Sequence, residues 1–272
     1  MIVIKGVRRT GKSSLLNVGL RISGIPYMIF DVRRFMPISM EKFYDVFGDL
    51  LTNFYRRNRG IKSVLDKVRG IGVYGFRVEF TDRNMGVLTN IIDMINEWGR
   101  KRNTFIALAF DEAQYLRMLR GIEELLAHIY DYCDNIKLIL TGSEVGILDK
   151  LLGVRRVEAP LYGRAYVEII MRRLADKEAI EFLKLGFNQA GKFISEDEIK
   201  EVVYRLGGII GWLTAYGYYR IRMNREGAME KVIQEGSSTV KKEILNFLSN
   251  RLQARDRYLT ILKSLDESMS WN

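Results

Sequence analysis

The stretch IVIKGVRRTGKS at residues 2–13 decides the fold of this chain. Its apolar start at residues 2–5 predicts a short buried strand, and the apolar spacing from Ser13 to Ile22 predicts a helix. Between them, Gly6 to Ser13 has the pattern GxxxxGK[ST]. Glycines allow the backbone to curl so that successive N–H groups point at an anion, and the positive end of the helix adds to this attraction. The stretch therefore predicts a phosphate-binding loop between a strand and a helix.

The predicted contacts to a nucleotide come from this loop and from the first turn of the helix. Lys12 is expected to bridge the β- and γ-phosphates, and the Ser13 hydroxyl is expected to ligate Mg²⁺. For Arg8 and Arg9, a supporting positive charge and simple exposure to solvent are both open interpretations. The predicted nucleotide contacts in this region are Gly6, Val7, Arg8, Arg9, Thr10, Gly11, Lys12, Ser13 and Ser14.

A second motif, FIALAFDE at residues 105–112, ends an unbroken apolar strand with two acids. Open α/β sheets bind ligands at the carboxyl ends of their strands. We predict that Asp111 holds Mg²⁺ through the water shell of the ion, opposite Ser13, and that Glu112 orients or deprotonates the attacking water. Taken alone, the two acids also fit the start of the next helix. Paired with the loop, the adjacent glutamate favours hydrolysis over phosphate transfer to a second small substrate.

Two further residues are candidates for contact with the γ-phosphate. The hydroxyls of Thr141 and Ser143, in the run TGSE at residues 141–144, could read that phosphate or position water, and a plain turn is the alternative. Arg164, in the run PLYGRAY, could stabilise transferring phosphate as an arginine finger, and a surface cation is the alternative. The predicted catalytic set is Lys12, Glu112, Ser143 and Arg164.

The apolar pattern predicts a three-layer α/β fold with a parallel sheet over residues 1–174. Unbroken apolar runs are typical of strands buried on both faces of such a sheet. The first two strands are expected to pair with each other, and alternating residues near 73–80 predict an inserted β-hairpin. The five sheet strands are expected at residues 2–5, 27–32, 105–110, 136–140 and 166–170.

Residues 175–250 carry no strand pattern and are expected to form a helical lid domain. Ser195 and Glu198 have the spacing of a capping box, and Gly207 with Gly208 is expected to end the same helix. A break in the last helix is expected near Gly236. The predicted helices cover residues 177–186, 196–206, 210–222 and 226–265.

Length and composition bound the class of protein. The 272 residues are 47% apolar and 28% charged, which is typical of a globular chain and excludes a wholly disordered one. No signal peptide and no run long enough to cross a bilayer are present in the sequence. One cysteine, Cys133, and one histidine, His128, exclude an internal disulfide and most zinc sites. A reduced cytoplasmic setting is expected, with Cys133 inert and without a histidine partner.

The net charge of +10 favours a phosphate-rich partner such as a nucleotide or nucleic acid. All of the excess of basic over acidic residues lies in residues 1–225. A basic surface that keeps the protein soluble is the alternative, and the pair Arg33 and Arg34 fits that interpretation.

The chain resembles the archaeal P-loop ATPases of the STAND branch, which are relatives of AAA+ and origin-recognition ATPases. The resemblance implies an ASCE-type sheet with the catalytic strand between others, a helical lid and a C-terminal winged-helix domain. By this resemblance, Lys12 binds phosphate, Ser13 and Asp111 bind magnesium, and Glu112 binds the water. It also implies a polar sensor at Ser143 and a γ-phosphate contact at Arg164. The matching motifs, in the order of the family, are GVRRTGKSSLL, FDVRRF, LAFDEAQYL, LTGSEVGIL, PLYGRAY, EAIEFLKLGF and LGGIIGWLTAYG.

Three features depart from the family pattern. The family has a segment before the first strand that covers the adenine, whereas this chain starts on that strand. Ile210 replaces a proline that lies against the base, and Ile210 is expected to pack against the adenine instead. Residues 251–272 resemble only the opening of the winged-helix domain.

The main functional hypothesis is Mg²⁺-dependent binding and hydrolysis of ATP that drives a conformational switch. ATP and Mg²⁺ are the expected cofactors. The expected partners are DNA, a protein or further copies of the chain, and no membrane is expected. One alternative is a nucleotide-binding remnant or interaction module without turnover. Another is a DNA-binding protein that uses its basic core surface.

Overall fold

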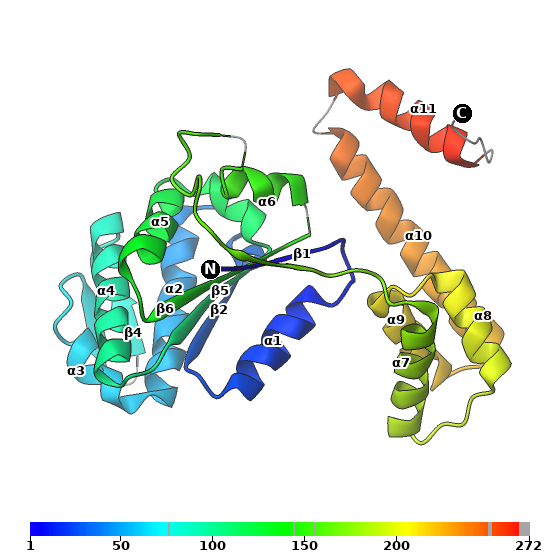
Figure 1. The fold of residues 1–272 in the computed structure, drawn as a ribbon, viewed down its shortest axis with the longest axis horizontal. Coiled ribbons are helices and arrows are strands. Elements are labelled where there is room, and N and C mark those ends of the chain that lie inside the picture. The colour runs from blue at the N-terminus through cyan, green and yellow to red at the C-terminus, as the bar shows by residue number, and fades with distance from the viewer. Residues whose placement is uncertain (76, 144, 155, 250–251, 267–272) are drawn as a thin grey trace. The chain divides into compact units, whose positions relative to one another are not determined.

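The computed structural model describes residues 1–75, 77–143, 145–154, 156–249 and 252–266. Two compact units divide the chain, Met1–Arg172 and Arg173–Asn272. The first unit is built on a sheet, and the second is built from helices (Figure 1). Among the described residues, no helix has the length and apolar character needed to cross a membrane.

A five-stranded parallel sheet forms the centre of the first unit, with the order β2-β5-β6-β1-β7. The five predicted strands are confirmed, but the predicted pairing of the first two is wrong because β5 and β6 lie between them. β5 is buried along its whole length and takes an interior position, whereas β2 alternates between buried and half-buried residues, as suits an edge. The strands are β1 (Ile2–Lys5), β2 (Tyr27–Asp31), β5 (Ile106–Asp111), β6 (Ile136–Gly142) and β7 (Val167–Ile170).

Helices cover both faces of this sheet, so the predicted three-layer architecture is confirmed (Figure 1). On one face, Ala107 and Ala109 of β5 pack with Leu16 and Leu20 of α1. The larger alternate residues of β5, with Phe30 of β2, join the core on the other face. The helices of the two outer layers are α1 (Lys12–Ser23) on the first face and α2 (Met40–Arg57), α4 (Met85–Lys101) and α5 (Ile122–Tyr132) on the second.

The inserted β-hairpin is also confirmed, and it packs against α2. Thr52 of α2 accepts a hydrogen bond from the Val78 backbone N–H at 2.9 Å, and the Phe80 ring lies against Tyr44 and Phe47. Short helical segments that lack a long apolar period were not predicted. The hairpin strands are β3 (Ile71–Tyr74) and β4 (Arg77–Phe80), and the short segments are η1 (Val32–Phe35), η2 (Arg59–Ile61), α3 (Lys62–Leu65), η3 (Ala113–Met118) and α6 (Val145–Leu151).

The second unit contains the predicted helices, but the expected break at Gly236 is wrong because α10 runs straight through it. A Cβ at Gly236 would lie 3.1 Å from the Trp212 ring, so the missing side chain lets two helices approach rather than ending one. The helix ends at Ser249 instead. The elements of this unit are α7 (Asp176–Gln189), α8 (Glu196–Leu206), α9 (Ile210–Arg220), α10 (Arg225–Ser249), η4 (Leu252–Ala254) and α11 (Arg255–Asp266).

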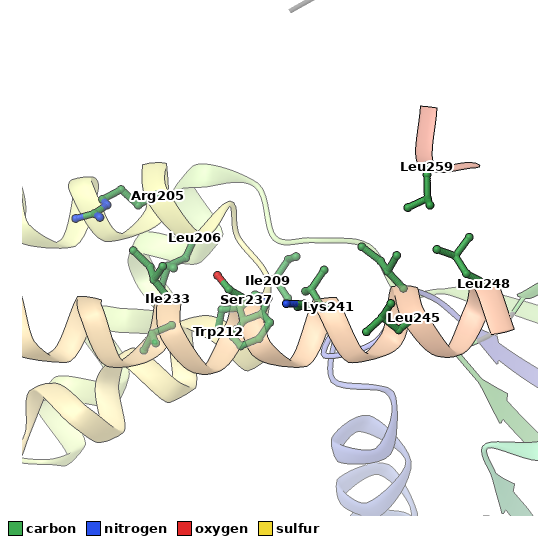
Figure 2. A pocket seen from close by; sticks show the side chains of 14 residues that line it. Arg205, Leu206, Ile209, Trp212, Ile233, Ser237, Lys241, Leu245, Leu248 and Leu259 are labelled. Atoms are coloured by element: carbon green, nitrogen blue, oxygen red, sulfur yellow. The ribbon is translucent and has the colours of Figure 1, made fainter. Parts of the chain in front are cut away.

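Trp212 also lines an apolar groove of about 670 Å³ within the second unit (Figure 2). The groove is bounded by Leu206 of α8, Leu245 of α10 and Leu259 of α11. The separate winged-helix start expected at residues 251–272 stays a prediction. Within it, the structure describes η4 and α11, and residues 251 and 267–272 lie outside the described residues.

Glu198 makes only half of the predicted capping box. The Ser195 hydroxyl accepts the Glu198 backbone N–H at 3.3 Å, as expected for an N-cap. The Glu198 side chain does not return to Ser195. It lies in the core of the helical unit, where its carboxylate accepts hydrogen bonds from the Tyr216 hydroxyl at 2.6 Å and from Arg220 Nε at 2.7 Å. A carboxylate that is only 6% exposed needs such partners.

Stability should therefore depend on the ionisation of Glu198. Burial by itself would raise the pKa of Glu198, but Arg220 and Tyr216 outweigh burial and lower it. A carboxyl whose pKa is lower in the folded than in the unfolded state adds stability above the unfolded pKa and loses it as the pH falls. We expect the free energy of unfolding, measured in urea, to decrease from about pH 5 to about pH 3.

Replacement of Glu198 by Gln should flatten this pH dependence, whereas Glu226→Gln, at an exposed position of α10, should leave it as in the wild type. Equal pH profiles for the wild type and Glu198→Gln would contradict the role given to this carboxylate.

Candidate functional site

The loop between β1 and α1 encloses the ammonium group of Lys12. Lys12 Nζ donates hydrogen bonds to the carbonyl oxygens of Gly6 and Val7, both at 2.8 Å. The Thr10 hydroxyl donates to the Val7 carbonyl at 2.8 Å, and Gly11 begins the helix in a left-handed conformation. Burial lowers the pKa of Lys12, and this effect outweighs the opposite effect of the nearby carboxylates of Glu112 and Asp111, which raise it. The sequence pattern thus forms the curled loop that it predicts.

Gly6 is required by the packing of the loop. A Cβ at this position would lie 2.4 Å from the Met171 carbonyl oxygen, which is backbone and has little freedom to move. The Met171 N–H donates to the Lys5 carbonyl just before the loop. The segment that follows β7 therefore lies directly against the start of the loop.

Asp111 joins the loop to two strands of the sheet. Its Oδ2 accepts a hydrogen bond from the Ser13 hydroxyl at 2.6 Å, although the two residues lie 98 positions apart. Its Oδ1 accepts from the Thr141 hydroxyl of β6. The Asp111 residue is only 4% exposed. The predicted pairing of Ser13 and Asp111 at one point is therefore present in the fold.

Glu112 is held beside Asp111 by its own backbone and by Ser143. The backbone of Glu112 is left-handed, with φ of 57°, and its N–H donates to the Thr141 hydroxyl at 3.2 Å. Its Oε2 accepts hydrogen bonds from the Ser143 hydroxyl at 2.7 Å and from Gln114 Nε2 at 2.6 Å. Burial alone would raise the pKa of Glu112, but these hydrogen bonds and Lys12 outweigh it and lower the pKa.

Gln114 is a site residue that the sequence predictions missed, and Thr141 entered them only as one of the hydroxyls of the TGSE run. Gln114 is 1% exposed, and its Oε1 has no hydrogen-bond partner among the described residues. A Cβ at Gly142 would lie 2.8 Å from that oxygen, so Gly142 makes room for the amide. The signal in the sequence is only that both residues adjoin predicted ones, since Gln114 follows Glu112 by two positions and Thr141 precedes Ser143 by two.

Arg33 is a third residue that sequence reasoning placed elsewhere. The expectation treated it with Arg34 as basic surface. In the structure, its guanidinium pairs with Asp31 and lies 3.7 Å from Asp111 Oδ2. The parallel register of β2 and β5 places Asp31 directly opposite Asp111, and this register brings Arg33 to the site.

The structure also describes where the remaining predicted site residues lie. Arg164 pairs with Asp131 of α5 and donates to the Pro160 carbonyl instead of reaching Asp111 or Glu112. Ser14 is exposed on α1, as are Val7, Arg8 and Arg9 on the loop, and Arg8 lies 3.5 Å from the Tyr115 hydroxyl. Ile210 is the first residue of α9 in the helical unit. Glu144 of the TGSE run lies outside the described residues.

A separate cluster joins Asp93 of α4 to His128 and Cys133, and their ligand atoms lie within 4.8 Å of one another. His128 Nε2 is 2.7 Å from Asp93 Oδ1, and the Cys133 thiol lies 3.7 Å from the same oxygen. Asp93 of α4 meets both residues at the end of α5, so His128 lies close to Cys133, but the hydrogen bond described for the thiol is to Asp93. Burial, with Asp93, raises the pKa of Cys133 to about 12, so the thiol is a weak nucleophile at neutral pH.

Comparisons with known proteins place this geometry in context. The sequence model of a family described as an ATPase domain predominantly from Archaea matches residues 1–215. Among solved structures, a Walker-type ATPase of Pyrococcus abyssi is 28% identical with a TM-score of 0.74, and the match covers 93% of this chain and 71% of that chain. No match was found among curated proteins.

Two more distant structures share the fold. The ORC2 protein of Aeropyrum pernix, in complexes with ADPNP and ADP, is 12% identical with a TM-score of 0.54. Drosophila ORC bound to DNA is 13% identical with a TM-score of 0.55. The matches cover 86% and 89% of this chain but 62% of each of those chains. At this identity the likeness is one of fold alone.

Thr141 should contribute measurably to stability, because its hydroxyl is shared by Asp111 and the Glu112 N–H. Thr141→Val keeps the shape but removes both hydrogen bonds. We expect the free energy of unfolding in urea to decrease by about 1–3 kcal/mol. Thr81→Val, at an exposed position of the same unit, controls for the change in residue type. A Thr141→Val variant as stable as the wild type would show that neither hydrogen bond matters for folding.

Proposed function

The chain belongs to a family of ATPase domains found predominantly in Archaea, and we propose that it binds ATP at residues 6–13 and hydrolyses it with Mg²⁺. The observation that carries this proposal is the 2.6 Å hydrogen bond between Ser13 and Asp111. It brings a hydroxyl and a buried carboxylate together at the start of α1, beside a loop that ends in Lys12.

The oxygen atoms of Ser13 and Asp111 fit the ligand preference of Mg²⁺, which is bound by hydroxyl, carboxylate and phosphate oxygens. A bound Mg²⁺ supplies positive charge that neutralises the phosphates of the nucleotide. In the proposal, Ser13 ligates the ion directly and Asp111 holds it from the strand side. Thr141 keeps Asp111 oriented through its hydrogen bond to Oδ1.

Lys12 is proposed to bind the β- and γ-phosphates. Its ammonium is enclosed by the curled loop, where it donates hydrogen bonds to the carbonyl oxygens of Gly6 and Val7. A phosphate oxygen is a stronger partner for an ammonium than a neutral carbonyl, because a hydrogen bond between opposite charges is roughly twice as strong. The backbone N–H groups of the loop and the start of α1 are proposed to bind the same phosphates.

Glu112 is proposed as the base that takes a proton from the attacking water. A general base must be ionised, and the lowered pKa of Glu112 keeps it so at neutral pH. Ser143 and Gln114 hold one of its oxygens, Oε2, and so fix the direction of the carboxylate. Ser143 is thereby proposed to act through Glu112, in addition to the predicted contact with the γ-phosphate.

The remaining part of the proposal concerns movement and partners. The helical unit is proposed to act as a lid that responds to the nucleotide, with Ile210 at the start of α9 against the adenine. The charge of +10, all of it within residues 1–225, supports an anionic partner such as DNA.

Loss of the Lys12 ammonium should abolish nucleotide binding. We expect Mg²⁺ and ADPNP to raise the thermal unfolding temperature of the wild type, and we expect no such rise for Lys12→Ala. Lys67→Ala, which removes an exposed positive charge from the same unit, should respond like the wild type. Undiminished stabilisation of Lys12→Ala would place the nucleotide elsewhere.

Glu112→Gln should separate binding from turnover. Phosphate release from ATP should fall by about 100-fold or more, because an amide cannot accept the proton from water. Stabilisation by Mg²⁺ and ADPNP should persist, since the loop is intact. Turnover equal to that of the wild type would exclude Glu112 as the base. A wild type that binds ADPNP but releases no phosphate would favour the binding module without turnover.

If DNA binds to the basic surface, its affinity should depend strongly on the salt concentration. The affinity for a duplex of arbitrary sequence should fall steeply as NaCl is raised, because each phosphate contact releases counterions. Fluorescence anisotropy with a labelled duplex measures this slope. An affinity that does not change with salt, or no binding at low salt, would remove DNA from the proposed partners.

A further inference from the structure

Arg33 is held at the carboxyl end of β2 by Asp31. Its backbone N–H donates to Asp31 Oδ1 at 3.1 Å, while its Nε and Nη2 donate to the two carboxylate oxygens at 2.7 and 2.9 Å. A bidentate contact of this kind fixes the plane of the guanidinium as well as its position. Arg33 is therefore oriented, even though 55% of its side chain is exposed.

The same guanidinium faces the carboxylate that is proposed to hold the metal. Arg33 Nη2 lies 3.7 Å from Asp111 Oδ2, and this oxygen is also the one that accepts the Ser13 hydroxyl. The Asp111 side chain is only 6% exposed, so the guanidinium contacts it from the solvent side. A divalent cation bound between Ser13 and Asp111 would thus share one carboxylate oxygen with Arg33.

We infer that Arg33 sets the affinity of this site for its divalent cation by sharing the Asp111 carboxylate with that cation. This inference rests on the proposed function. Two cations on one carboxylate repel each other, so the fixed positive charge of Arg33 weakens metal binding. Asp31 keeps the guanidinium close to the site, which makes the repulsion a built-in property of the fold. The site then requires more Mg²⁺ than Ser13 and Asp111 alone would need.

Arg34 provides a matched control. It is the next residue in the chain and has a similar exposure of 51%, but its guanidinium pairs with Asp49 of α2 at 3.8 Å rather than with Asp111. Removal of Arg34 changes the net charge by the same amount as removal of Arg33. A difference between the two variants therefore reports the position of the charge and not the total.

The experiment measures binding of ADPNP by calorimetry across a series of MgCl₂ concentrations. For Arg33→Ala, the Mg²⁺ concentration that gives half-maximal binding should fall by about threefold to tenfold relative to the wild type. Arg34→Ala should match the wild type. Arg33→Lys retains the charge and should lie within about twofold of the wild type.

Equal Mg²⁺ requirements for Arg33→Ala and the wild type would overturn the inference while leaving the proposed function intact. Weaker binding of ADPNP by Arg33→Ala at saturating Mg²⁺ would also overturn it, and would identify Arg33 as a phosphate ligand. If the wild type bound no ADPNP at any Mg²⁺ concentration, both the inference and the proposed function would fail.

Discussion

The buried carboxylate of Asp111 is the constraint on which the arrangement of this site depends. An ionised carboxylate that is almost removed from water is costly unless polar groups surround it. Here the hydroxyls of Ser13 and Thr141 supply hydrogen bonds, and they come from α1 and β6 on either side of β5 in the chain. The cost of leaving Asp111 unpaired therefore ties three separate elements to one geometry. The start of α1, the end of β5 and the neighbouring β6 cannot shift independently.

The same geometry positions Glu112. Its left-handed backbone turns the chain out of β5 into η3, and the N–H that this turn releases is bound by Thr141. The side chain is then directed by Ser143 and Gln114, while Arg33 approaches the neighbouring carboxylate from β2. Charges of both signs thus lie in one small region, with Lys12 and Arg33 balancing Asp111 and Glu112. This balance connects the fold to the proposed chemistry, because buried charges are costly unless opposite charges or hydrogen bonds lie beside them.

The helical unit follows the same rule with a different role. Glu198 is buried and satisfied by Tyr216 and Arg220, so a polar group links α8 to α9 within an otherwise apolar core. The sequence suggested a cap for this residue, since a local pattern cannot show that Tyr216 lies within reach. Gly236 is a second example. The sequence pattern predicts a helix break there, but the close packing of the Trp212 ring shows why this position in α10 is a glycine.

The sequence by itself determined the sheet strands and the main residues of the candidate site. Its apolar runs and the GxxxxGK[ST] pattern identified five strands, the loop with Lys12 and Ser13, and the acids at the end of β5, because each of these signals is local. Tertiary structure alone decided the strand order and the place of Thr141 and Gln114 beside the acids. It also decided that Arg164 pairs with Asp131, and that Arg33 lies near Asp111 whereas Arg34 lies near Asp49. Those contacts join residues distant in the chain, and their partners are set by sheet register and helix packing, which no short pattern encodes.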